Sequence, residues 1–147
     1  MTRKLLTTVT AAFALSIAGP CFAQSDAPYT EGPVWTVTMV KTKPGMSDDY
    51  LKMLAKVYKT ANDEAKKQGI IMDYKILLGD ASTPKDYDIL LLQEFPNMAA
   101  FDGLRDKLDP IDKKIAGGLE AERQGAVKRM EVREIMGDKV MREVTLK

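Results

Sequence analysis

The stretch that decides the fold runs from Asp88 to Phe95 and reads Asp-Ile-Leu-Leu-Leu-Gln-Glu-Phe. It is the most apolar run of the chain once the N-terminus is set aside, and its length is typical of a strand. Between Ile89 and Leu92 no polar residue alternates with the apolar ones, a pattern that indicates a strand covered on both faces. We therefore expect the central strand of a single sheet, with helices on one face and something else, such as a second subunit, on the other.

The N-terminus has the pattern of an export signal. Arg3 and Lys4 precede an apolar run over residues 5–18, and Gly19 and further small residues lead to Ala23. The run is shorter than the ~20 residues that span a bilayer, and no later segment is long enough, so we expect no membrane span. We predict a signal peptide over residues 1–23, cleaved near Ala23, and a periplasmic or secreted mature protein.

Cys21 is the only cysteine, and removal of the signal removes it. The alternative, lipidation of Cys21, is less favoured because Pro20 stands directly before it. A mature chain without cysteine has neither a disulfide nor a thiolate. The full chain has 22 basic and 21 acidic residues, a balance that gives no electrostatic reason to bind nucleic acid or an anionic membrane.

The rest of the chain predicts a linker over residues 24–33, which contain prolines and a glycine, and one domain over residues 34–147. Ser47 is expected to cap the first helix. The expected elements are strands over 34–42, 70–78, 88–95 and 140–146, and helices over 47–68, 97–117 (broken at Asp109-Pro110 and ended at Gly117-Gly118) and 119–136 (ended at Gly137). This βαββαβ order predicts an α+β fold of the ferredoxin-like kind, a four-stranded antiparallel sheet with helices on one face and the first and third strands central.

Side-chain parity along the strands divides the sheet into two faces. The more apolar set is expected to meet the helices: Trp35, Val37, Met39, Met72, Tyr74, Ile76, Ile89, Leu91, Phe95, Val140, Val144 and Leu146. The opposite set mixes apolar and polar groups: Thr36, Thr38, Asp73, Lys75, Leu90, Leu92, Glu94, Met141, Glu143 and Thr145. Such a mixture is too apolar to be bare and too polar for an ordinary core.

The order of elements resembles the dimeric α+β barrel superfamily, especially its Dabb-like and NIPSNAP-like members. Three phrases are similar as well: Val-Lys-Thr-Lys-Pro-Gly-Met (40–46), Pro-Asn-Met-Ala-Ala-Phe (96–101) and Arg-Glu-Val-Thr-Leu (142–146). The resemblance implies a homodimer in which two sheets pack face to face and enclose a cavity that can hold a small molecule. By that analogy the mixed face lines the cavity, with Thr36, Thr38, Lys75, Leu90, Leu92, Met141 and Glu143 as ligand-binding residues.

The chain has no histidine, the residue on which the haem-binding and several catalytic branches of that superfamily depend. Without histidine or a mature cysteine a zinc or iron site of those ligands is excluded, and no spacing matches a calcium loop, so no metal and no cofactor are expected. Acid–base chemistry would then rest on Asp73 and Glu94, which neighbouring strands place on one face. Enclosure would raise the pKa of such a carboxyl group.

Three functions remain open at this point. The first is an exported homodimer that binds a small, largely apolar molecule between its two sheets. The second is a cofactor-free monooxygenase or isomerase in which Asp73 or Glu94 is the base. The third is a protein–protein interaction module without a ligand, which uses the loop over 79–87 or the helix break at Asp109-Pro110. For the two carboxylates, an ion pair with Lys75 at the border of a dimer interface is favoured over catalysis.

Overall fold

The computed structural model describes residues 26–147 of the chain. The predicted signal peptide and its cleavage site lie outside the described residues. No helix within residues 26–147 has the length and apolar character needed to cross a bilayer.

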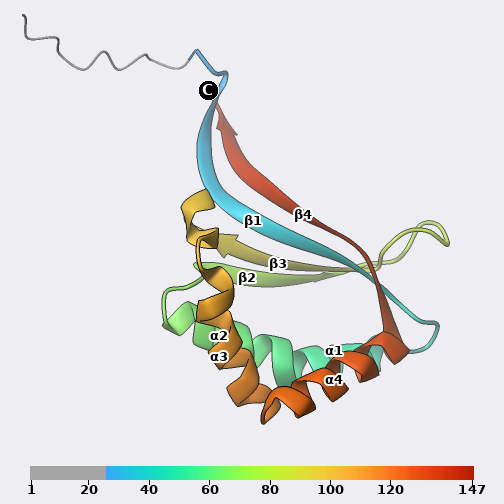
Figure 1. Ribbon diagram of the computed structural model, residues 1–147. Coiled ribbons are helices and arrows are strands. Elements are labelled where there is room, and N and C mark those ends of the chain that lie inside the picture. Colours follow the sequence, from blue (N-terminus) through green and yellow to red (C-terminus); the bar gives the residue numbers. More distant parts are fainter. Residues whose placement is uncertain (1–25) are drawn as a thin grey trace, which may run out of the picture.

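Four antiparallel strands form one sheet in the order β2-β3-β1-β4 (Figure 1). Their bounds are Tyr29–Thr42 (β1), Asp73–Leu78 (β2), Ile89–Phe95 (β3) and Arg133–Leu146 (β4). The first and third strands are central, which confirms the ferredoxin-like α+β fold predicted from the order of elements.

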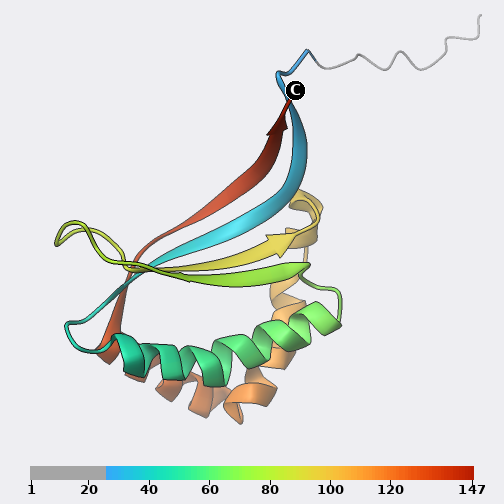
Figure 2. The same ribbon diagram turned by 180° about the vertical axis from the view of Figure 1, so that it is seen from behind.

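The helices α1 to α4 lie on one face of this sheet, and no element of the described chain covers the other face (Figures 1 and 2). Their bounds, with a π-helical segment η1 and a 3-10 turn η2, are Ser47–Met53 (α1), Leu54–Tyr58 (η1), Lys59–Lys67 (α2), Met98–Phe101 (η2), Leu104–Ala116 (α3) and Leu119–Val132 (α4). The predicted helix over 47–68 is therefore one helix in three parts. We call the face of the sheet under the helices the inner face and the opposite one the outer face.

The core between sheet and helices consists of two clusters of buried side chains. One surrounds Ile89 and Leu91 of β3, and the other surrounds Phe95 at the end of the same strand. Phe95 is fully buried and its ring lies 4.7 Å from that of Phe101. The stretch from which the fold was predicted thus supplies side chains to both halves of the core.

The strand β1 has the opposite facing to that predicted. Its register places Val34 opposite Phe95 and Val40 opposite Ile89, and all four side chains are fully buried on the inner face. Because side chains alternate along a strand, Trp35, Val37 and Met39 lie on the outer face and the two threonines on the inner one. The prediction failed because both sets of β1 side chains contain apolar residues, and the larger set was taken as the core.

Several predicted bounds are also wrong. The strand β1 begins at Tyr29, inside the predicted linker, because its first residues pair with the end of β4. The last helix ends at Val132, because Arg133 and the following residues pair with β1 instead of continuing the helix to Met136. Gly137 therefore lies within β4, opposite Met39.

Of the local sequence signals for the ends of helices, the glycine pair predicted the structure correctly, and the proline and the serine did not. Gly117 and Gly118 have positive φ (85° and 118°) and separate α3 from α4, as predicted. Pro110, in contrast, lies inside α3 and does not break it. Ser47 is the first helical residue, and no side chain caps α1.

The ends of β1 and β4 extend beyond the other two strands as a two-stranded arm (Figure 1). The helices do not reach this arm, so Val144 and Leu146 are exposed, the latter by 78%. Val140, which lies opposite Thr36 where β3 is still part of the sheet, is exposed as well. Met72, which precedes β2, is also exposed. The prediction that these four residues are core residues is wrong.

Candidate functional site

Most of the residues predicted to line a cavity gather on the outer face. Asp73 and Glu94 are register partners on β2 and β3, as predicted. Glu94 lies opposite Trp35, which in turn lies opposite Met141 of β4. The same face includes Lys75, Leu90, Leu92 and Glu143, together with Val37, Met39 and Leu77.

The charged groups of the outer face are paired in a way that the sequence did not predict. Asp73 accepts a hydrogen bond at 2.8 Å from Lys66 of α2, and this bond holds the pKa of the Asp73 carboxyl below its ordinary value. Lys75 forms no salt bridge within residues 26–147, and its Nζ lies 5.0 Å from the centre of the Trp35 ring. In the single chain Asp73 is thus a salt-bridged anion, which makes it a weaker base than a free aspartate.

Thr36 and Thr38 lie on the inner face, so they cannot line a space between two sheets. The Thr36 hydroxyl donates to Gln93 Oε1 at 3.4 Å, and the Thr38 hydroxyl donates to Asp138 Oδ1 at 2.6 Å. Their assignment as residues of the inter-sheet cavity is therefore wrong, and the reason is the facing of β1.

The structure contains a pocket of about 520 Å³ on the inner side of the sheet, between β3 and the helices. We call it the helix–sheet pocket. Its size lies within the ~300–1,000 Å³ typical of small-molecule sites. Much of the wall is apolar and includes Met53, Leu54, Val57, Leu91, Leu108 and Ile115.

A chain of buried amides lies at the sheet side of the helix–sheet pocket. Gln93 Nε2 donates to Asn62 Oδ1 at 2.6 Å, and Asn62 Nδ2 donates to the Tyr58 carbonyl at 2.8 Å. Only 2% of Asn62 is exposed. Since buried polar groups need partners, this chain explains how the inner face accommodates Gln93 and the hydroxyl of Thr36.

The π-helical segment η1 contributes Leu54, Val57 and Tyr58 to the same pocket. Short π-helical segments are rare and occur frequently at functional sites. The Tyr58 hydroxyl donates to the Leu92 carbonyl at 3.3 Å, and burial raises the pKa of Tyr58 far above its ordinary value. Tyr58 is therefore a neutral phenol at physiological pH, suited to donating a hydrogen bond and not to accepting a proton.

Four charged side chains line the helix–sheet pocket on the side of α3 and α4: Asp112, Glu122, Arg129 and Arg133. The Arg133 guanidinium lies 5.6 Å from the centre of the Tyr50 ring, and Arg133 Nε is buried without a hydrogen-bond partner. Burial, followed by the charges of Glu122 and Asp109, raises the pKa of Asp112, while Arg129 opposes this shift.

These four charged residues were not predicted. In the sequence they belong to helices with regularly spaced charges, which indicate a solvated surface. Nothing in the spacing shows that α3 and α4 turn these particular side chains toward the sheet. Among residues 26–147 no group of three or more potential ligands is placed to hold a metal ion.

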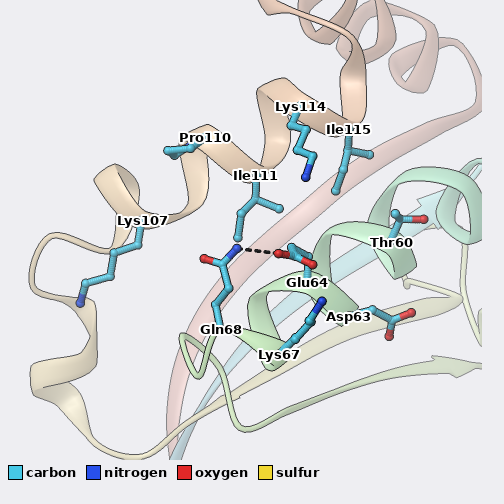
Figure 3. A pocket seen from close by; sticks show the side chains of 10 residues that line it. All are labelled: Thr60, Asp63, Glu64, Lys67, Gln68, Lys107, Pro110, Ile111, Lys114 and Ile115. Atoms are coloured by element: carbon cyan, nitrogen blue, oxygen red, sulfur yellow. Dashed lines mark hydrogen bonds between the residues drawn. The ribbon is translucent and has the colours of Figure 1, made fainter.

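A second hollow, a groove of about 540 Å³, runs between α2 and α3 (Figure 3). Ile111 points from α3 toward Glu64 of α2 and Gln68, the residue that follows α2, and the Gln68 side chain donates a hydrogen bond of 2.7 Å to Glu64. Lys67 and Lys114 also line the groove, and both are exposed. Its size is similar to that of the helix–sheet pocket, but its exposed, charged lining suits an apolar molecule less well.

No family model matches the chain, and no curated protein matches it. Among solved structures it is similar to a dimeric ferredoxin-like protein from an uncultured marine organism, with 11% identity over 80% of this chain and 90% of the other and a TM-score of 0.47. It is also similar to HapK from Hahella chejuensis (10% identity, 75% and 91% covered, TM-score 0.45) and to a NIPSNAP family protein with unknown function from Agrobacterium tumefaciens (13% identity, 79% and 90% covered, TM-score 0.45). The fold assignment rests on the strand order of the sheet.

Proposed function

We propose that this protein is an exported homodimer that binds a small, largely apolar molecule in the helix–sheet pocket of each subunit. The observation that carries the proposal is the pocket itself, about 520 Å³ in volume with a largely apolar wall. Small-molecule sites combine such walls with a few polar groups that orient the ligand. Asn62, Gln93 and the Tyr58 hydroxyl are groups of that kind here.

The binding site proposed here differs from the inter-sheet cavity expected from the sequence. Two of the residues expected there, Thr36 and Thr38, lie on the inner face, and Asp73 is bound to Lys66. The outer face is also richer in apolar side chains than expected, since it holds Trp35 and Val37. We assign it to the contact between subunits.

The exposed apolar side chains of the outer face support this subunit contact. Leu77 is 51% exposed and Met141 is 54% exposed, and both lie on the same face as Leu92 and Trp35. Contiguous apolar patches of this kind mark protein–protein contact sites. The surrounding charges include both signs, which permits a self-complementary contact about a two-fold axis.

A neutral apolar fluorophore, N-phenyl-1-naphthylamine, tests binding in the pocket of the mature protein. Gly125→Leu puts a side chain into the pocket lining, and a Cβ at this position meets only Arg129 Nη1, at an ordinary 3.5 Å. We expect the variant to bind the fluorophore at least about tenfold more weakly, while α4 itself gains helix propensity of about 0.8–1 kcal/mol. Ala126→Leu, at an exposed neighbouring position outside the lining, is the matched control.

Equal binding by the wild type and both variants would place the fluorophore elsewhere, and no binding by the wild type would contradict the proposed site. Native mass spectrometry of the exported protein provides a second measurement, because a bound natural ligand adds a fixed mass to each subunit of the dimer.

A second candidate function is a cofactor-free monooxygenase or isomerase with its base in the helix–sheet pocket. Asp112 supports it, because a carboxyl group whose pKa is raised by burial is better matched to removing a proton from an acidic carbon or phenol. On this proposal Asp112→Asn abolishes turnover and leaves ligand binding intact, while Asp73→Asn preserves both. Loss of turnover in Asp73→Asn but not in Asp112→Asn would indicate that the base is Asp73, on the outer face.

A further inference from the structure

We infer that the ligand of the helix–sheet pocket is an organic anion, a mainly apolar molecule with one acidic oxygen group that Arg133 and Arg129 receive. This inference rests on the proposed function and names the class of molecule that the pocket takes. The first observation behind it concerns Arg133, which begins β4 directly after the end of α4. Its Nε atom is buried and has no hydrogen-bond partner.

A buried guanidinium donor without an acceptor is uncommon, because burial deprives it of water and nothing replaces the lost hydrogen bonds. Arg133 also has no ion pair with any carboxylate among residues 26–147. Its charge is partly stabilised by the face of the Tyr50 ring, 5.6 Å away. The guanidinium is thus held beside Tyr50, with its Nε–H group left without an acceptor.

Arg129 adds a second guanidinium to the same part of the pocket. It precedes Arg133 by four positions, lines the pocket, and likewise has no ion pair in the described part of the chain. Both arginines act on the Tyr50 hydroxyl, since the charge of each lowers its pKa against the larger effect of burial. Two positive charges therefore converge near one wall group of the pocket.

The lining has three cationic side chains and two acidic ones. Asp112 and Glu122 line the pocket as well, and burial, followed by the charges of Glu122 and Asp109, raises the pKa of Asp112 against the effect of Arg129. Lys56 adds a third cation to the lining. An anionic ligand meets an excess of positive groups, and the planar fork of an arginine matches a carboxylate or a comparable oxygen acid.

Two fluorophores with the same skeleton test separately whether the pocket binds a ligand and whether it prefers an anion. N-phenyl-1-naphthylamine is neutral, whereas 1-anilinonaphthalene-8-sulfonate is the same skeleton with one sulfonate. The wild type should bind the sulfonate about tenfold more tightly than the neutral compound, and high salt should reduce that preference. Gly125→Leu should weaken both, which would locate both compounds in the pocket and not on the outer face.

Arg133→Met keeps the length of the side chain and removes its charge. We expect it to lose the preference for the sulfonate while it still binds the neutral compound, which at the same time shows that the pocket is folded. Arg129→Met, which leaves the α4–β4 junction unchanged, should reduce the preference as well. Arg123→Met is the control, because Arg123 lies on the same helix, is exposed and lies outside the lining.

The outcomes are distinguishable. If the neutral compound binds in the pocket but the wild type shows no preference for the sulfonate, or if the preference survives both Arg133→Met and Arg129→Met, the ligand class is wrong and the proposed function stands. If neither compound binds to the wild type, the proposed function and the inference fail together.

Discussion

The amide pair of Asn62 and Gln93 tests whether the polar residues of β1 and β3 truly face the helices. Asn62 makes two hydrogen bonds, one to the Tyr58 carbonyl and one from the Gln93 side chain, at 2.8 and 2.6 Å. Asn62→Ala removes both and leaves a carbonyl and an amide without their partners. At a net ~0.5–1.5 kcal/mol for each bond, the free energy of unfolding should fall by about 2 kcal/mol.

For a domain of this size a loss of about 2 kcal/mol corresponds to a decrease of roughly 6–10 °C in Tm. Gln93→Ala should cost somewhat less, because its second contact, with the Thr36 hydroxyl, is long at 3.4 Å. The double variant should be more stable than the sum of the single losses predicts, with a coupling of about 1 kcal/mol, since the two side chains share one hydrogen bond.

Urea unfolding followed by circular dichroism measures these differences at constant m-value. Thr60→Ala is the control, because Thr60 lies on the same helix but is exposed and bonds only to the Lys56 carbonyl. Its effect should stay within about 0.5 kcal/mol. Strictly additive losses in the Asn62 and Gln93 variants would show that the two amides do not meet, and the inner-face placement of Thr36 would be refuted with them.

The remaining predictions concern the subunit contact, the two unusual aspartates and the core. Leu92→Lys on the outer face should convert the dimer to monomers in sedimentation velocity, whereas Leu78→Lys, at an exposed position on the other parity of the sheet, should not. The pKa of Asp73 is lowered, so its ion pair stabilises the fold above the ordinary pKa of 3.8 and this contribution is lost as the pH falls below it; Asp73→Asn should lower Tm at pH 7 and not at pH 2. Burial raises the pKa of Asp112, so its ionisation destabilises the fold as the pH rises above the ordinary value of 3.8. Asp112→Asn should therefore raise Tm at pH 7 and leave it unchanged at pH 2. A lower Tm at pH 7 in calorimetry would contradict the burial of this carboxyl group. Phe95→Ala should cost about 3–5 kcal/mol in denaturant unfolding, and a loss below 1 kcal/mol would show that this ring is not central to the core.

The elements whose signals are local were predictable. The helix that starts at Ser47 and ends before Gly69 has an apolar stripe, acidic residues in its first turn and lysines in its last, and the structure has it with only a π-helical segment in its middle. The apolar stretch of β3 and the glycine pair at Gly117 likewise lie where their residues indicate. Strand order followed from the sequence of elements, because right-handed crossovers leave few alternatives.

Features that depend on pairing were not predictable in the same way. Residues 133–136 have the charge pattern of the helix that precedes them, but the backbone of Arg133 and Ile135 pairs with Thr42 and Val40. The hydrogen bonds of a sheet edge thus outweigh a modest local preference for helix. The pocket charges Asp112 and Arg129 were missed for a related reason, since the rotation of α3 and α4 about their axes is decided by packing and not by spacing.

The side chains of β1 are apolar on both faces of the sheet, and this bears on what covers the outer face. A strand with one face in water alternates clearly between apolar and polar residues, and its phase is then easy to assign. In β1, fully buried Val34 and Val40 share the inner face with two threonines, while Trp35, Val37 and Met39 lie outside. Which set of β1 side chains faces the helices is ambiguous from the sequence, because both sets contain apolar residues. The threonines are tolerated on the inner face because Gln93 and Asp138 accept hydrogen bonds from their hydroxyl groups. An outer face of this composition is disfavoured in water, so the ambiguity itself supports a sheet whose second side is covered by another subunit.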